Sequence, residues 1–327
     1  MVSWPSTHYL DLSRSSLGEL HKKSRLILFM SLTGIILVLI SATLHVGWNF
    51  LIRSSSNPRV FPLIRGTAII GMSAIFLSRI PLHQIPSAVW FYVSLSGFVH
   101  ALYVLSLSTA YVKGDISYVY PIARSAPAFV PIAGFFIFGE TVSLQGGVGI
   151  FVVVLCIFLL QLGGGDAEDS KHLFAFIRRG ESLWAFAALA TVVTYSLIDK
   201  AGMVAFAHVK TLPSSLHGPT FFMLEALLSN FIYWGYMASR REFGDRHIWK
   251  REWFRGILAA LATMFSYSLI LHVMKTEHLG YIVTLRQSSV LIAVMVGWLI
   301  LKEKQGLSRL LIAGAMLIGF FLVAMAK

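Results

Sequence analysis

The stretch YPIARSAPAFVPIAGFFIFGE, residues 120–140, is long and apolar enough to cross a membrane, which takes about 20 helical residues. It nevertheless contains three prolines and an arginine. Tyr120, Arg124, Pro127 and Pro131 recur at helical spacing on one face. Proline leaves backbone carbonyls without partners, and in a membrane these are tolerated only where protein or water satisfies them. This face is therefore expected to border a polar interior rather than lipid.

The whole chain has the composition of a membrane protein. Of its 327 residues, 56% are hydrophobic and 13% are charged, and the mean hydropathy is +0.73. Soluble domains are about 45–50% apolar and about 25% charged. The net charge of +12 comes mostly from short connections, where Lys and Arg hold helix ends at the anionic membrane surface. These features predict an integral membrane protein with the lipid bilayer as a partner and no nucleic acid.

The apolar runs predict ten membrane spans. They lie at 27–52, 58–79, 87–111, 116–138, 143–162, 182–203, 217–239, 253–275, 279–301 and 306–326. Residues 1–26 form a polar N-terminal segment, and residues 163–181, with a glycine run and acidic residues, form a linker near the midpoint. The expected fold is an all-α integral membrane protein with two five-helix halves, residues 27–162 and 182–327.

A shift of 163 residues aligns the ends of the two halves without a gap. The aligned identities are Tyr118 with Tyr281, Ser125 with Ser288, Gly134 with Gly297, Ile137 with Ile300, Glu140 with Glu303, Leu144 with Leu307, Phe158 with Phe321 and Leu159 with Leu322. Because five spans is an odd number, the second copy must cross the membrane in the opposite orientation. The sequence thus predicts two inverted five-helix repeats, an architecture in which secondary transporters hold substrate near mid-membrane.

Two runs carry a resemblance to a known family. GDISYVYPIARSAPAFVPIAGFFIFGE (114–140) and VTLRQSSVLIAVMVGWLILKEK (283–304) resemble the EamA-type transporters of the drug/metabolite transporter superfamily. In such repeats an apolar helix ends in Gly-Glu, before a short turn and a glycine-bearing last helix. Gly139-Glu140 matches this pattern, whereas Lys302-Glu303 lacks the glycine. The resemblance covers residues 27–326 and implies a multi-pass transporter of the plasma (inner) membrane.

The first span sharpens this resemblance. SATLHVGWNFLIRSS (41–55) resembles a subgroup whose first helix carries a His-x-x-Trp-Asn pattern, and Arg65 stands where many members have an arginine. The subgroup often shows Leu-Arg-Glu where this chain has Leu-Arg-Gln at 285–287. If that glutamate serves proton coupling in the subgroup, its replacement argues against such coupling here.

Three arginines inside predicted spans are the first candidate substrate-binding residues: Arg65, Arg124 and Arg286. A charged side chain inside a membrane usually faces a cavity or a partner. The guanidinium group binds carboxylate, phosphate, phosphonate or sulfonate groups in a bidentate manner. The alternatives are that each arginine pairs with an internal acid or with helix-end carbonyls, or that Arg65 reaches the interface.

Polar side chains complete the candidate site. Glu225 is interpreted as the only acid near mid-membrane and as a counter-ion to an arginine, with proton carrier and structural acid as alternatives. His45, with Trp48 and Asn49 one turn later, is a candidate binding wall. The remaining candidates are Gln287 and Ser288, which the repeat places opposite Arg124 and Ser125, and Tyr120, Tyr195 and Tyr267, for which Tyr195 and Tyr267 could equally be packing residues.

Two further features are given a structural interpretation. Glu140 and Glu303 fall at span ends, where each is expected to begin the following helix. The run QGGVG (145–149) has no preceding strand and is expected to allow close helix packing rather than nucleotide binding.

These observations favour a secondary transporter that moves a small anionic or zwitterionic metabolite by alternating access, as a monomer or homodimer, without cofactor or metal. An intramembrane enzyme is the first alternative, but the chain has no His-Glu-x-x-His or Gly-x-Ser-x-Gly motif. A structural or sensory membrane protein is the second. The orientation stays open, because the resemblance places the termini in the cytoplasm whereas the distribution of Lys and Arg favours the opposite side.

Overall fold

A computed structural model describes residues 30–57, 60–113, 119, 122–161, 182–299 and 307–326, and every regular element within these residues is helical. The helices are α2 (Leu32–Arg53), α3 (Val60–Leu77), η1 (Leu82–Gln84), α4 (Ser87–Lys113), α6 (Ala126–Phe138), α7 (Leu144–Gln161), α9 (Leu183–Ala207), α10 (Ser214–Arg240), α11 (Arg246–Met274), α12 (Leu279–Arg286), α13 (Ser288–Leu299) and α14 (Leu307–Ala324). The expected N-terminal segment, the linker at 163–181 and Glu303 lie outside the described residues.

Several of these helices can cross a membrane, which confirms the prediction of a multi-pass membrane protein. Within the described residues, five are long and apolar enough: Leu32–Ile52, Val60–Leu77, Ser87–Ala110, Leu183–Ala207 and Arg246–Met274. Four shorter apolar helices accompany them, in α6, α7, α12–α13 and α14. The longer helix α10 has 27 residues and a more polar sequence, with Glu225 near its middle.

The predicted continuous spans at 116–138 and 279–301 are wrong in one respect, because each is interrupted. The first breaks at Arg124 and Ser125, just before α6, and the second at Gln287, between α12 and α13. Pro127 explains the first break, since it lacks the N–H group that would bond the carbonyl of residue 123. The second break has no proline and is followed by two serines, which favour helix starts over helix interiors.

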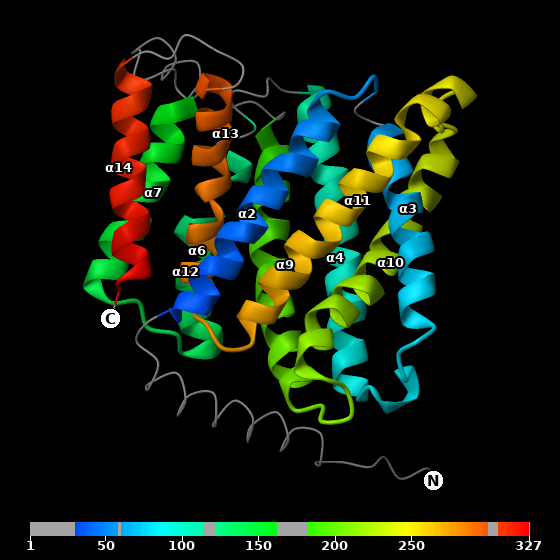
Figure 1. Ribbon diagram of the computed structural model, residues 1–327, viewed down its shortest axis with the longest axis horizontal. Helices are drawn as coiled ribbons and strands as arrows, with labels where there is room; N and C mark the ends of the chain where they lie inside the picture. Colours follow the sequence, from blue (N-terminus) through cyan, green and yellow to red (C-terminus); the bar gives the residue numbers. More distant parts are fainter. Residues whose placement is uncertain are drawn as a thin grey trace.

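The helices form three groups along the long axis of the molecule (Figure 1). Helices α6, α7, α12, α13 and α14 lie at one end, α3, α4, α10 and α11 lie at the other, and α2 and α9 stand between them. The main packing pairs are α2 with α11, α4 with α9, and α7 with α14. Smaller interfaces join α3 to α10 and α6 to α12.

Close packing of α7 against α14 depends on glycine, as expected from the run at 145–149. A Cβ atom on Gly149 would lie 2.8 Å from the carbonyl oxygen of Gly319, and one on Gly319 would lie 2.9 Å from a methyl group of Val153. Without side chains at these two positions the helix backbones approach directly, which is how small residues hold membrane helices together.

A cluster of polar side chains connects α2, α9 and α12 to the segment between α6 and α7. We call it the end cluster, and its members are Ser31, Glu140, Lys200 and Glu277. Lys200 Nζ lies 3.4 Å from Glu140 Oε1 and donates to the carbonyl of Glu277 at 2.6 Å. The other oxygen of Glu140 accepts from the backbone N–H of Leu279 at 2.8 Å. Ser31, at the start of α2, donates to Glu277 through its hydroxyl group at 2.6 Å. Glu140 therefore caps α12 and pairs with Lys200, which corrects the expectation that it begins the helix following it.

A second polar tie joins the far end of α2 to the start of α11. Glu252 accepts from the backbone N–H of Ser56 at 2.9 Å and from its hydroxyl group at 2.8 Å. Arg255 donates to the other carboxylate oxygen at 3.0 Å and to the carbonyl of Ser54 at 3.1 Å. Helices α2 and α11 are thus held together near both of their ends.

Candidate functional site

Four of the predicted site residues in the first half meet at one place. The indole N–H of Trp48 donates to Nδ1 of His45 at 3.1 Å, and a guanidinium nitrogen of Arg124 lies 3.1 Å from Nε2 of the same ring. Arg65 stands over the Trp48 ring at 5.0 Å from its centroid, within the range of a cation–π contact. We call His45, Trp48, Arg65 and Arg124 the arginine wall.

The imidazole of His45 faces two hydrogen-bond donors, Trp48 and Arg124. Indole nitrogen and guanidinium can only donate hydrogen bonds, whereas a neutral imidazole has a single acceptor nitrogen. His45 therefore accepts from Trp48 or from Arg124, but not from both at once.

A second constellation, here called the carboxyl pair, consists of Asp199 on α9 and Glu225 on α10. Both side chains are buried, Asp199 at 0% and Glu225 at 2% exposure. The Ser96 hydroxyl on α4 bridges them, lying 2.7 Å from Glu225 Oε2 and in hydrogen-bond contact with Asp199 Oδ1. The Tyr267 hydroxyl on α11 donates to Asp199 Oδ2. Four helices thus converge on two carboxyl groups inside an apolar bundle.

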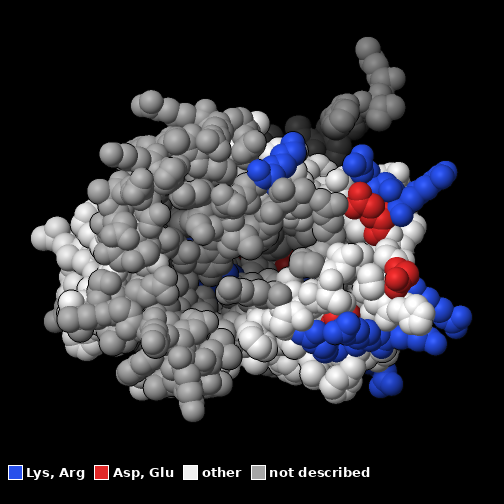
Figure 2. Space-filling model, turned by 90° about the horizontal axis from the view of Figure 1, so that it is seen from above, with Lys and Arg blue, Asp and Glu red and all other residues white. Residues whose placement is uncertain are grey.

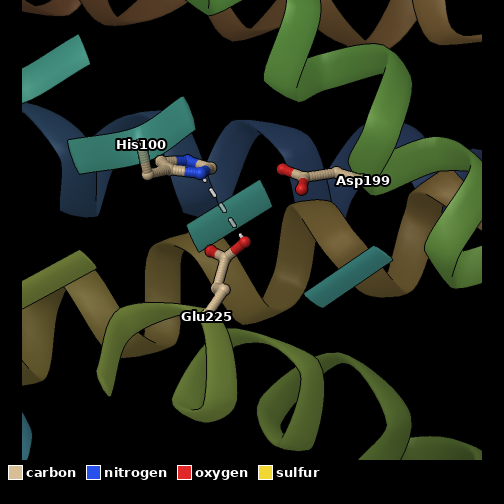
Figure 3. A group of neighbouring side chains, drawn as sticks. All are labelled: His100, Asp199 and Glu225. Atoms are coloured by element: carbon tan, nitrogen blue, oxygen red, sulfur yellow. Dashed lines mark ion pairs between the residues drawn. The ribbon is translucent and has the colours of Figure 1, made fainter. Parts of the chain in front are cut away.

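Aromatic rings and one arginine surround the carboxyl pair. His100 Nδ1 lies 3.6 Å from Glu225 Oε2, and Figure 3 shows the imidazole and the two carboxyl groups facing a common point from three helices. The His100 ring stacks on Tyr195 with centroids 3.9 Å apart. Arg286, the last residue of α12, stands over the Tyr267 ring at 5.0 Å from its centroid. Tyr195, Tyr267, Glu225 and Arg286 were all predicted site residues, and the structure brings them together.

Arg286 interacts electrostatically with both the arginine wall and the carboxyl pair. Arg286 lies within electrostatic reach of His45, of Tyr195 and of Asp199. The charge of Arg124 also acts on Tyr195. Arginines from both halves of the chain therefore converge on one region, although they are not at equivalent positions of the repeat.

Unpaired polar atoms lie at the second helix break. Gln287, Ser288 and Ser289 are buried, with 4–6% of their surface exposed. The amide oxygen of Gln287 and both serine hydroxyl groups have no hydrogen-bond partner among the described residues. An unpaired buried polar atom costs about 1–3 kcal/mol. These atoms lie beside Arg286 and at the N-terminus of α13, where a helix favours negative charge.

The structure leaves two predicted residues undescribed and revises the interpretation of Glu225. Tyr120 and the side chain of Asn49 lie outside the described residues. Glu225 contacts Ser96, His100 and Asp199, and no arginine among the described residues forms an ion pair with it, so the counter-ion hypothesis does not fit this arrangement. The expectation that Glu225 is the only acid near mid-membrane is wrong, because Asp199 shares its site.

Sequence reasoning therefore missed Asp199 and Ser96. The signal for Asp199 was present, since the dipeptide Asp199-Lys200 places two charges inside an apolar span, and intramembrane charge marks function or pairing. Ser96 had no such signal, because a serine in a membrane helix is unremarkable in composition and common in helix packing.

One atom each from His100, Asp199 and Glu225 lies within 4.8 Å of the others, a spacing that a divalent metal ion could bridge. Three of the four carboxylate oxygens, however, are in hydrogen-bond contact with the hydroxyl groups of Ser96 and Tyr267. The arrangement is that of a hydrogen-bonded network rather than of an open coordination sphere.

Basic side chains gather on one part of the surface. Figure 2 shows Lys and Arg side chains gathered at one end of the face seen from above, where α10 ends and α11 begins. The exposed basic residues of this connection are Arg240, Arg241, Arg246, Lys250 and Arg251. Basic residues beside membrane helices favour contact with anionic headgroups.

Comparison with known proteins supports a membrane transporter in general terms. No family model matches the chain. Over 77 residues, 23% of this chain, the sequence is 36% identical to the multidrug resistance protein EbrB of Bacillus subtilis (strain 168), of which the match spans 64%, just under two thirds. A crystal structure described only as that of a protein matches with a TM-score of 0.63 and 14% identity, covering 90% of this chain and 97% of its own. The structural likeness shows a shared fold alone.

Proposed function

We propose that this protein is a secondary transporter, not an enzyme, that moves a small anionic or zwitterionic metabolite across the membrane by alternating access between two inverted five-helix repeats. The substrate classes that fit are amino acids, organic acids, phosphonates and sulfonates. The observation that carries the proposal is the pair of helix breaks, each with an arginine beside it: Arg124 at the first and Arg286 at the second. Discontinuous helices of this kind form the substrate sites of many transporters.

The packing of the helices supports the inverted repeat. In the proposed repeat, each helix of the first half has an equivalent in the second. The equivalent helices are α2 and α9, α3 and α10, α4 and α11, α6 and α12–α13, and α7 and α14, and a two-fold relation would exchange the members of each pair. Under this exchange the α2–α11 interface becomes the α9–α4 interface, and both are among the largest in the protein. The α7–α14 and α3–α10 interfaces map onto themselves. This is the pattern that a two-fold relation between the halves would produce, as in the EamA-type transporters that the sequence resembles.

The charge of the site supports an anionic group on the substrate. The arginine wall and Arg286 place three guanidinium groups around one region. A carboxylate or phosphonate would accept two hydrogen bonds from one guanidinium group. The unpaired atoms of Gln287 and Ser288 could bind the polar remainder of the substrate.

Ligand-induced stabilisation of the purified protein tests this proposal. A panel of amino acids, dicarboxylates, phosphonates, sulfonates and cationic drugs is screened for a rise in melting temperature, which grows with the logarithm of ligand concentration over Kd. Arg124→Gln and Arg286→Gln should each weaken binding of the anion that is found by about 10- to 100-fold, since a charge-assisted hydrogen bond contributes about 1.5–3 kcal/mol.

Arg240→Gln is the matched control, because its side chain is 61% exposed at the surface. It should leave both the binding and the transport of that anion unchanged in liposomes. Equal transport by wild type, Arg124→Gln and Arg286→Gln would contradict the arginine site.

Cationic drugs define a second candidate function. The partial match to a protein named for multidrug resistance and the buried pair of Asp199 and Glu225 favour it. Stabilisation by cationic drugs alone, abolished by Glu225→Gln and retained by Arg286→Gln, would select this function over the first. For either substrate we propose the plasma (inner) membrane as the location and a monomer or homodimer as the working unit.

A further inference from the structure

The hydrogen bonds of Ser96 demand an extra proton. Its hydroxyl oxygen lies within hydrogen-bond distance of Asp199 Oδ1 and of Glu225 Oε2, but a serine hydroxyl carries only one hydrogen. It can donate to one carboxylate oxygen only. The second contact becomes a hydrogen bond only if the other carboxyl group is protonated and donates to Ser96.

Electrostatics leads to the same requirement. Two carboxylates that share a site cannot both be ionised at low cost, because like charges repel strongly where water is excluded. Among the described residues no Lys or Arg forms an ion pair with either acid, and the nearest basic group is His100, at 3.6 Å from Glu225. Asp199 has the better donors, since Tyr267 also donates to it. The proton therefore belongs on Glu225, which then donates to Ser96, while Ser96 and Tyr267 donate to ionised Asp199.

We propose that Asp199 and Glu225 are a proton-binding site that holds one proton between them through Ser96, and that this site is coupled to substrate binding through Tyr267 and Arg286. Ionisation releases one proton and leaves one additional negative charge on the pair. The coupling rests on the proposed transport function, whereas the shared proton does not.

The surroundings of the pair identify what controls its charge. Helix α4 presents His100 and Tyr103, α9 presents Tyr195, α11 presents Tyr267 and α12 presents Arg286. Arg286 is the only one of these with a permanent positive charge. It touches the ring whose hydroxyl group binds Asp199, so its charge bears directly on the pair.

Anion and proton should consequently bind together. An anion beside Arg286 offsets the guanidinium charge, which leaves the pair in a more negative field and favours the protonated form. Linkage is reciprocal, so the protonated pair also favours the anion. Cooperative uptake of an anion and a proton is the behaviour of a symporter. The proton site thus lies elsewhere than at Gln287, where the family resemblance suggested that a coupling glutamate had been replaced.

Infrared spectroscopy of the full-length protein in detergent tests the site without any substrate, with pH as the only variable. A protonated buried carboxyl group has a carbonyl stretching band that a carboxylate lacks. Wild type should show this band at neutral pH and lose it as pH rises. Glu225→Gln should lack it at neutral pH, because Asp199 alone is ionised by its hydroxyl donors. Asp199→Asn should change the pH midpoint of the band, which provides a second variant if Glu225→Gln does not fold.

The control variant is Glu252→Gln. That carboxyl group accepts hydrogen bonds from Ser56 and Arg255, so it is ionised and should not contribute to the band. The proposal is overturned if wild type shows no protonated-carboxyl band between about pH 5 and pH 9, or if Glu225→Gln and Asp199→Asn leave the band unchanged.

Arg286→Gln tests the connection to the substrate site. Loss of this cation should move the pH midpoint of the band upward by roughly one unit, because a nearby positive charge favours the ionised pair. An unchanged midpoint would overturn the coupling. Anion transport without the band would remove the proton site and leave the proposed function intact. Presence of the band without any anion binding would leave the proton site intact and remove the proposed function.

Discussion

Asp199 and Lys200 are neighbours on α9, both are buried, and each lies against an acidic side chain from another part of the fold. Successive residues of a helix point about 100° apart, so the two side chains enter different clusters. Lys200 meets Glu140 in the end cluster, where the two side chains form an ion pair. Asp199 meets Glu225 in the carboxyl pair, where two acids face each other with no lysine or arginine ion pair among the described residues.

This difference separates a structural charge from a functional one. In the end cluster Lys200 and Glu140 form an ion pair. The hydrogen bonds of this cluster fix the start of α12 to α9 and α2. Such an arrangement has no reason to change its protonation during a transport cycle. In the carboxyl pair a shared proton reduces two negative charges to one, so the protonation of the pair responds to pH and to any ligand that alters the field of Arg286.

The largest effect is expected from Lys200→Met. The substitution leaves Glu140 buried without its cation and removes the donor to the carbonyl of Glu277. Breaking one half of a buried ion pair costs about 3–5 kcal/mol. The melting temperature of the detergent-purified protein should therefore fall by on the order of 5–10 °C.

Two further variants identify the cause of that loss. Glu140→Gln combined with Lys200→Met removes both charges of the ion pair and should recover part of the lost stability, because Glu140 is no longer left without its cation. Lys275→Met is the matched control, since this lysine binds Ser214 at an exposed site and should matter little. A melting temperature of Lys200→Met equal to that of wild type would contradict the structural role of the end cluster.

An intermediate effect is expected from Ser96→Ala in the carboxyl pair. The variant loses the hydroxyl group that bridges Asp199 and Glu225, and hydrogen bonds to charged groups contribute about 1.5–3 kcal/mol each. The expected outcome is a melting temperature a few degrees lower. Ser239→Ala, whose hydroxyl group binds a backbone carbonyl at an exposed position, should have no measurable effect. If both serine variants behaved alike, the bridge would contribute nothing to stability.

The sequence predicted the membrane class and the approximate limits of the helices because these follow from apolar length alone. The predicted span at 143–162, for example, is the helix at 144–161, and the glycines at 149 and 319 lie at the close crossing between α7 and α14. The two helix breaks were missed for different reasons. The prolines of the first were recognised but placed within one continuous helix, and the second has no proline to reveal it.

Part of the candidate site could be predicted from the sequence, and part could not. Arginines, histidine and tryptophan could be selected from the sequence, since each is expensive or unusual inside a membrane, and the structure places Arg124 on His45 and Arg65 on Trp48. The contact between Asp199 and Glu225 could not be predicted, because it depends on how α9 and α10 pack against α4. Partners across helices are determined by tertiary packing, which single-helix patterns do not contain.

The smallest loss of stability is expected from Glu225→Gln. It is compared with Glu140→Gln, because the same chemical change is then made in each cluster. Glu140→Gln leaves Lys200 as a buried cation without its acid, so it should cost about 3–5 kcal/mol. Glu225→Gln replaces an acid that is already protonated with an amide of nearly the same shape, whose N–H can donate to Ser96 in place of the carboxyl O–H. No charge is stranded, and the expected change in stability at neutral pH is under about 1 kcal/mol. Melting curves of both variants measured side by side decide the matter. A large loss in Glu225→Gln would mean that Glu225 is ionised in the folded protein, and the two acidic clusters would then not differ in the way the geometry indicates.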